Sequence, residues 1–168
     1  MKNICRQAGL TERYFHESLR DREDLLATVH DEQIRGIQVA TLAAADQAGP
    51  ELKAQVRAGL DAFVRTLTDD PRKARTVLIE AVGVGPRLEQ HRHAVMHEFA
   101  DFTAARALPH MGTPTTPKLP TMTIALDGGV NELLVDLTPG RRQSSIEETV
   151  DLCTPLTVAA YDAVTRQA

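Results

Sequence analysis

Apolar residues recur at intervals of three and four along most of the chain, the spacing that gathers them on one face of an α-helix. The clearest stripe consists of Leu52, Val56, Leu60, Phe63 and Leu67. No stretch of useful length alternates apolar and polar residues with the period of two that a half-buried β-strand requires. The pattern therefore predicts an all-α protein.

Capping and turn residues divide the first half of this pattern into successive helices. Asp21 is expected to cap a helix that runs to about residue 48. Gly49-Pro50 then starts a helix that ends at residues 69–71, where a proline can occupy the first turn of the next one. That helix should stop at residues 83–86. A longer helix is expected to follow, up to about residue 108.

The second half begins with a proline-rich segment, residues 109–120, which predicts a long mobile loop. A strongly apolar helix should follow and end at residues 138–140. The last helix is expected to open with a capping box, and two pairs fit its spacing. Pro155 lies inside this helix, so a kink is expected there. The two capping pairs are Ser144 with Glu147 and Ser145 with Glu148.

Composition sets limits on size and partners. At 168 residues, the chain can bury one sizeable core, or form a small head joined to a larger body. Its net charge of −4 argues against non-specific nucleic-acid binding by the whole chain. Cys5 and Cys153 are far apart in sequence and have no metal-binding spacing, so reduced thiols are expected. The absence of a bilayer-length apolar run or a secretory signal predicts a cytoplasmic protein without a membrane partner.

The first 26 residues carry the most specific motif. Gly9 can adopt the left-handed conformation that ends one helix, and Thr11 can cap the next by accepting a hydrogen bond from a free amide. Asp21 then opens a third helix. Two short helices at this spacing are typical of a helix-turn-helix.

This segment resembles the DNA-reading end of the TetR family of bacterial repressors. The residues that occupy the family's motif positions are Ile4, Cys5, Ala8, Gly9, Leu10, Thr11, Phe15, His16, Ser18, Leu19, Arg22, Glu23, Leu25 and Leu26. Residues 70–72, 80–84 and 128–134 extend the resemblance along the chain. It implies a partial helix-turn-helix head over residues 1–22 and a ligand-binding and dimerisation domain over residues 23–168. Family members begin with a further helix, whose absence here is expected to reflect either a truncation or a mis-chosen start.

The resemblance also implies which residues contact DNA. The second helix of such a motif lies in the major groove, and the helix that follows meets the backbone. Arg13 is the best candidate for reading guanine through a bidentate contact. An ordinary solvated helix face is the alternative interpretation. The base-facing candidates are Glu12, Arg13 and Tyr14, and the phosphate-binding candidates are Thr11, His16 and Arg22.

A ligand pocket is the second implied site. In the family, the helices between the head and the last two helices form a pocket whose ligand alters DNA affinity. The apolar stripes here favour an apolar or aromatic small-molecule effector and no cofactor. The same residues also suit an ordinary core. The candidate lining residues are Phe63, Leu67, Val77, Glu80, Ala81, Met96, His97, Phe99 and Phe102.

A dimer interface is the third site that the resemblance implies. In the family, the last two helices pair with their copies in a second subunit as a four-helix bundle. These helices here offer more apolar surface than one small body readily hides, which favours a homodimer. The alternative is that both helices belong to the core of a monomer. The candidate interface residues are Leu126, Gly129, Val130, Leu133, Leu152, Leu156 and Ala160.

Metal binding and catalysis receive less support. Glu89, His93 and His97 fall at four-residue steps on one helix face, a spacing at which imidazoles can bind zinc. No second cluster completes a tetrahedral site and Arg92 adds positive charge, so a solvated face without metal is predicted. The sequence has no glycine-rich phosphate loop, nucleophile elbow or plausible Cys/His pair. We therefore expect no enzyme activity.

Together these patterns predict a ligand-responsive transcriptional regulator, a repressor that binds operator DNA as a homodimer and is released by a small apolar or aromatic molecule. The alternative is a dimeric ligand-binding protein that has lost DNA binding through N-terminal shortening.

Overall fold

The computed structural model describes residues 2–9, 11–80, 83–111, 118–137 and 145–166. Every regular element within these ranges is a helix, which confirms the all-α prediction for the described part of the chain. The elements are α1 (Lys2–Gln7), α2 (Glu12–Ser18), α3 (Arg22–Gln47), α4 (Leu52–Thr68), α5 (Pro71–Arg75), the π-helical turn η1 (Thr76–Glu80), α6 (Pro86–Met111), α7 (Leu119–Leu137) and α8 (Ile146–Thr165).

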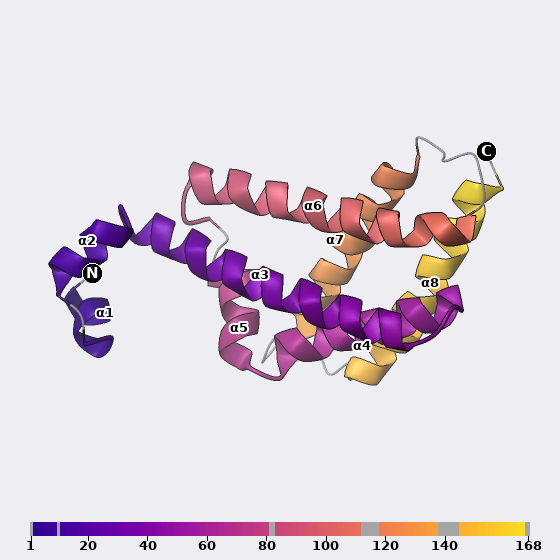
Figure 1. The fold of residues 1–168 in the computed structure, drawn as a ribbon, viewed down its shortest axis with the longest axis horizontal. Helices are drawn as coiled ribbons and strands as arrows, with labels where there is room; N and C mark the ends of the chain where they lie inside the picture. Colours follow the sequence, from indigo (N-terminus) through magenta and orange to yellow (C-terminus); the bar gives the residue numbers. More distant parts are fainter. Residues whose placement is uncertain (1, 10, 81–82, 112–117, 138–144, 167–168) are drawn as a thin grey trace.

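The helices form a small head and a larger body (Figure 1). The head consists of α1 and α2, and it projects from the start of α3. In the body, α3 packs chiefly against α4, α4 against α8, and α6 against α7. The two long helices α3 and α6 run side by side away from the head, so the start of each lies at the head end of the body. None of the described helices is both long and apolar enough to cross a membrane.

Local capping interactions set several helix boundaries where the sequence predicts them. The side chain of Asp21 accepts a hydrogen bond of 2.9 Å from the amide of Asp24 at the start of α3. Ser145 and Glu148 form the reciprocal capping box of α8, which settles the choice between the two pairs. Gly9 has a φ of 68°, the left-handed conformation expected after α1. Helix α8 continues through Pro155.

Other boundaries differ from the predictions. Thr11 occupies the N-cap position of α2, but its side chain makes no capping hydrogen bond. The predicted loop at 109–120 overlaps the helices on both sides of it. Helix α6 extends through Pro109 to Met111, and α7 begins at Leu119. Pro120 is tolerated in the first turn of α7, where its missing N–H would have no helical partner. The middle of the predicted loop, residues 112–117, lies outside the described residues.

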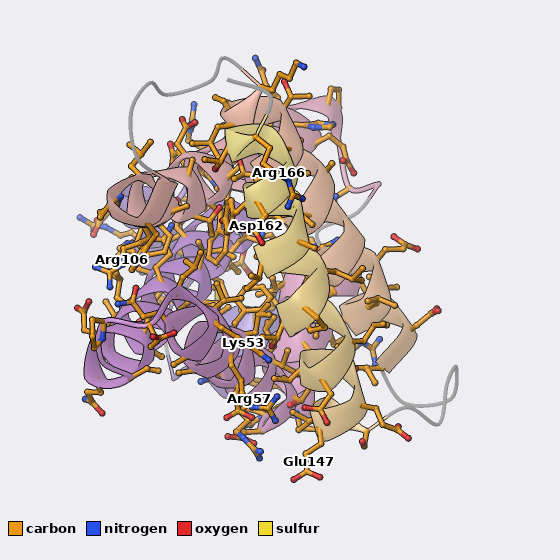
Figure 2. The ribbon with its side chains drawn as sticks, turned by 90° about the vertical axis from the view of Figure 1, so that its right-hand side faces the viewer. Lys53, Arg57, Arg106, Glu147, Asp162 and Arg166 are labelled. Carbon is orange, nitrogen blue, oxygen red and sulfur yellow. The ribbon has the colours of Figure 1, made fainter. Side chains whose placement is uncertain are left out.

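Two buried clusters hold the body together. The larger one joins α3, α4, α5, η1, α7 and α8, with Ile37, Leu67 and Leu134 among its fully buried side chains. The smaller one joins α6, α7 and α8 around Ala107 and Tyr161. Helix α8 contributes to both clusters and crosses the end of the body remote from the head (Figure 2).

The surface ion pair between Arg57 of α4 and Asp151 of α8, 2.5 Å apart, lies beside the point where α8 crosses the body.

Both cysteines are buried and unpaired, Cys5 in the head and Cys153 in the larger cluster. Burial raises the pKa of the Cys153 thiol.

Candidate functional site

The body contains a partly open cavity of about 170 Å³, lined by side chains from α3, α4, η1, α6, α7 and α8. Most of the lining is apolar. One wall is aromatic, because the ring centroid of Phe99 lies 5.2 Å from that of Phe63 and 5.8 Å from that of Phe102. An apolar cavity with a few placed polar groups is the usual form of a small-molecule site.

Six of the nine sequence-predicted pocket residues line this cavity: Phe63, Leu67, Val77, Met96, Phe99 and Phe102. His97 does not line it and is exposed, because it lies one helical position beyond Met96 and points away from the face that α6 turns inward. The side chain of Glu80 and the whole of Ala81 lie outside the described structure.

A carboxyl group is the most distinctive polar feature of the lining. Asp127, on α7, accepts a hydrogen bond of 3.0 Å from the hydroxyl of Thr103 on α6. Burial raises the pKa of Asp127 to about 6, although the Thr103 hydrogen bond acts in the opposite direction. Tyr161 lines the same region, and burial together with the charge of Asp127 raises its pKa to about 12. Asp127 can therefore accept a hydrogen bond from a ligand, or pair with a cationic one.

Sequence reasoning missed Asp127, Thr103 and Tyr161. The one sequence signal for this part of the site was Asp127, an acidic residue in the middle of an otherwise largely apolar helix. Its partner Thr103 lies 24 residues away on another helix, and no spacing rule connects the two.

The head end of the body contains a polar joint between α3 and α6. Arg87 donates hydrogen bonds of 3.0 and 3.1 Å to the two carboxylate oxygens of Asp21. The carboxylate of Glu23 accepts a hydrogen bond of 2.7 Å from the backbone amide of Leu88, one of the free amides in the first turn of α6. The hydrogen bonds from Asp24 and Arg87 hold the pKa of Asp21 below its usual range. The joint ties the start of α6 to the helix that carries the head.

The predicted DNA-contacting residues all lie in the head or at the start of α3. Arg13 is exposed, and its Nε forms an ion pair of 2.9 Å with Glu17, one turn further along α2. The ring of His16 packs edge-on against Phe15, with centroids 5.3 Å apart. The side chain of Tyr14 lies outside the described structure. The remaining candidates, Thr11, Glu12, His16 and Arg22, are exposed.

The head has a small core and an exposed apolar face. Phe15 and Cys5 are buried between α1 and α2. Ile4 on α1 and Ala8 just after α1 are exposed.

The predicted dimer residues fall into two groups. Val130 is buried in the core of the monomer, Leu133 packs partly buried against that core, and Leu126 lines the cavity. Leu152 and Leu156 are each 53% exposed on α8. Gly129 is exposed and Ala160 is half-buried.

Together with Pro155 and Ala159, the two α8 leucines form an exposed face at steps of three and four. The structure thus leaves one apolar helix face uncovered on the body.

The sequence-predicted metal candidates do not form a cluster. His93 and His97 are exposed. The carboxylate of Glu89 accepts hydrogen bonds from the Gly83 amide at 2.5 Å and from Arg92 at 3.3 Å. Glu89 is thus bonded to the Gly83 amide and Arg92, while both histidines face solvent.

No family model matches the chain, and no curated protein or solved structure matches it either.

Proposed function

We propose that this protein is a ligand-responsive transcriptional regulator of the TetR kind, which binds operator DNA as a homodimer and releases it when a small, largely apolar molecule occupies the cavity. The observation that carries the proposal is the polar joint between α3 and α6. Helix α6 contributes Phe99, Phe102 and Thr103 to the cavity, and its start is hydrogen-bonded to the base of the helix-turn-helix-like head.

The cavity supports a ligand of limited size and specific chemistry. A cavity of about 150 Å³ lined by apolar side chains accommodates a benzene-sized molecule, and this one is slightly larger. The aromatic wall formed by Phe63, Phe99 and Phe102 suits a flat apolar ring. Asp127 adds a preference for a hydrogen-bond donor or an amine, since an acceptor-only ligand would add no donor to the one that Thr103 supplies to the carboxylate.

The coupling mechanism would be a population shift. A ligand that packs between α6 and the opposite wall favours the position of α6 that fits it best. Because Arg87 and Leu88 at the start of α6 are bonded to Asp21 and Glu23, movement of α6 changes how the head is held. In a dimer, such a change alters the spacing of the two heads relative to paired half-sites one helical turn apart.

The alternative is a dimeric ligand-binding protein that does not bind DNA. The exposure of the apolar residues Ile4 and Ala8 favours it, because apolar side chains left in solvent contribute no burial energy to the stability of the head. The two proposals share the cavity and the dimer, and differ only in the activity of the head.

Fluorescence-anisotropy titration against DNA flanking the protein's own gene, with random duplex as competitor and at two salt concentrations, separates them. Arg13→Ala is expected to weaken specific binding by about 1–3 kcal/mol, or roughly 5–150-fold, if Arg13 reads a guanine. Arg65→Ala is the matched control, because Arg65 is also an exposed arginine paired with a carboxylate one turn away, but on α4. Binding that is no stronger than to random duplex would contradict the regulator and leave the ligand-binding protein.

A further inference from the structure

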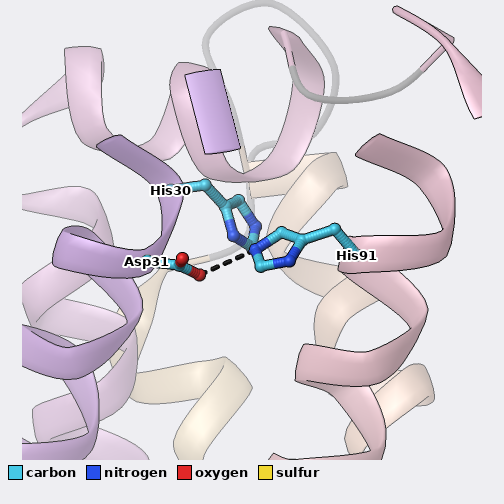
Figure 3. A group of neighbouring side chains, drawn as sticks. All are labelled: His30, Asp31 and His91. Atoms are coloured by element: carbon cyan, nitrogen blue, oxygen red, sulfur yellow. Dashed lines mark hydrogen bonds and ion pairs between the residues drawn. The ribbon is translucent and has the colours of Figure 1, made fainter. Parts of the chain in front are cut away.

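Three side chains capable of binding a metal meet between α3 and α6 (Figure 3). His30 and Asp31 are consecutive on α3, and His91 faces them from α6. Nε2 of His91 lies 2.7 Å from Oδ1 of Asp31. The rings of His30 and His91 are nearly perpendicular, with centroids 5.8 Å apart. One potential ligand atom from each residue lies within 4.8 Å of the other two.

His30 gives independent support for a ligand at this position. The residue is only 3% exposed, and its Nδ1 is buried without a hydrogen-bond partner in the described structure. A buried polar atom without a partner costs free energy, and such atoms are uncommon in folded proteins. Coordination of a metal ion by Nδ1 would give this atom a partner.

Arg92 is the unfavourable neighbour of the cluster, and its ion pair with Glu89 at 3.3 Å partly offsets its charge.

We propose that His30, Asp31 and His91 bind one divalent transition-metal ion, with Zn²⁺ as the best match, and thereby bridge α3 and α6. Two imidazoles and a carboxylate are a usual donor set for zinc sites that keep a fourth position for water. Metal–ligand bonds of about 2.0–2.1 Å place tetrahedral ligand atoms about 3.4 Å apart, so modest side-chain rotations close the cluster around an ion. Asp31 then exchanges its contact with His91 for the metal.

The sequence pattern pointed to other histidines because it detects only residues on one helix. His91 lies 60 residues from Asp31, and only the packing of α6 on α3 brings them together. The site lies between the polar joint and the cavity, and His30 itself contributes to the cavity lining. The inference goes beyond the proposed regulatory function and does not rest on it, because metal binding is measured on the protein alone.

The test is a Zn²⁺ titration of the chelator-treated full chain, followed by competition with a zinc indicator, and a Co²⁺ titration read by visible absorption. We expect one Zn²⁺ per chain and the Co²⁺ spectrum of a four-coordinate nitrogen and oxygen site. His91→Ala should weaken Zn²⁺ binding by about 100-fold or more, since even outer-shell partners of zinc ligands carry about 10–100-fold in affinity. His93→Ala and His97→Ala are matched controls, being exposed histidines on the same helix, and should bind as the unmodified chain does.

Asp31→Asn provides a second variant that does not open the core, since Asp31 is only partly buried, unlike His30. Circular dichroism establishes that each variant remains helical before its affinity is compared. The proposal is overturned by the absence of Zn²⁺ binding at micromolar concentration, or by full affinity in a folded His91→Ala variant. It is also overturned if His93→Ala or His97→Ala abolishes binding, because the metal would then be held by the exposed face of α6.

Discussion

Asp127 on α7 accepts a hydrogen bond of 3.0 Å from the Thr103 hydroxyl on α6, and this pair places a carboxyl group in an otherwise largely apolar cavity wall. The pair joins the two helices and gives the cavity a titratable carboxyl group. Because burial raises the pKa of Asp127 to about 6, its charge changes close to physiological pH.

The raised pKa predicts a specific pH dependence of stability. The folded protein binds the Asp127 proton more tightly than the unfolded chain, whose carboxyl has a pKa of 3.8, so stability falls as pH rises from about 4 to about 6. The full pKa difference, from 3.8 to about 6, lowers the free energy of unfolding at neutral pH by at most about 3 kcal/mol. Asp127→Asn should therefore raise the free energy of unfolding at pH 7 by up to that amount, and change it little at pH 4.

Urea unfolding between pH 4 and pH 7 measures this difference. Asp101→Asn, at an exposed position on α6, serves as the control and should follow the unmodified chain at every pH. Parallel curves for the unmodified chain and Asp127→Asn across this range would show that Asp127 is not held in an environment that favours its protonated form.

The polar joint predicts a second effect on stability. Glu23→Ala removes the carboxylate that accepts the hydrogen bond from Leu88 and leaves that amide of the first turn of α6 without its partner. The expected loss is about 1–2 kcal/mol in the free energy of unfolding, comparable to the loss of a helix cap. Glu51→Ala is the control, because Glu51 occupies the N-cap of α4 without a side-chain capping bond, and its effect should stay below about 0.5 kcal/mol. Equal losses in the two variants would contradict the role of Glu23.

The exposed apolar face of α8 predicts the position of the dimer interface. Leu152→Glu combined with Leu156→Glu places charges at two leucines that are each 53% exposed, so that burying the rest of each side chain would contribute about half of the roughly 1.5–3 kcal/mol of full burial, and the protein should become monomeric. Light scattering after size exclusion measures the mass, and circular dichroism should show unchanged helix content. Val39→Glu, at a more exposed apolar position on α3, should remain dimeric. A monomeric unmodified chain, or a dimeric double variant, would make this prediction wrong.

The ligand pocket shows how far sequence patterns extend. Periodicity identified the inward faces of α4 and α6 well enough to place Phe63, Phe99 and Phe102 on the lining. It placed His97 there wrongly, because neighbouring positions on a helix point about 100° apart and a stripe predicted from sequence has indistinct edges. The assignment to a transcriptional regulator, the DNA contacts and the dimer remain predictions.

The sequence by itself determined the helical class and many of the helix boundaries. The bonds that fix those boundaries are local, such as Asp21 with Asp24 and Ser145 with Glu148, and each joins residues three positions apart. The tertiary structure alone decided which helix faces meet. It brought Thr103 to Asp127, Leu88 to Glu23 and His91 to Asp31, pairs separated by 24, 65 and 60 residues. Such contacts depend on the packing of whole helices and on their rotation about their axes, and neither is encoded in local spacing.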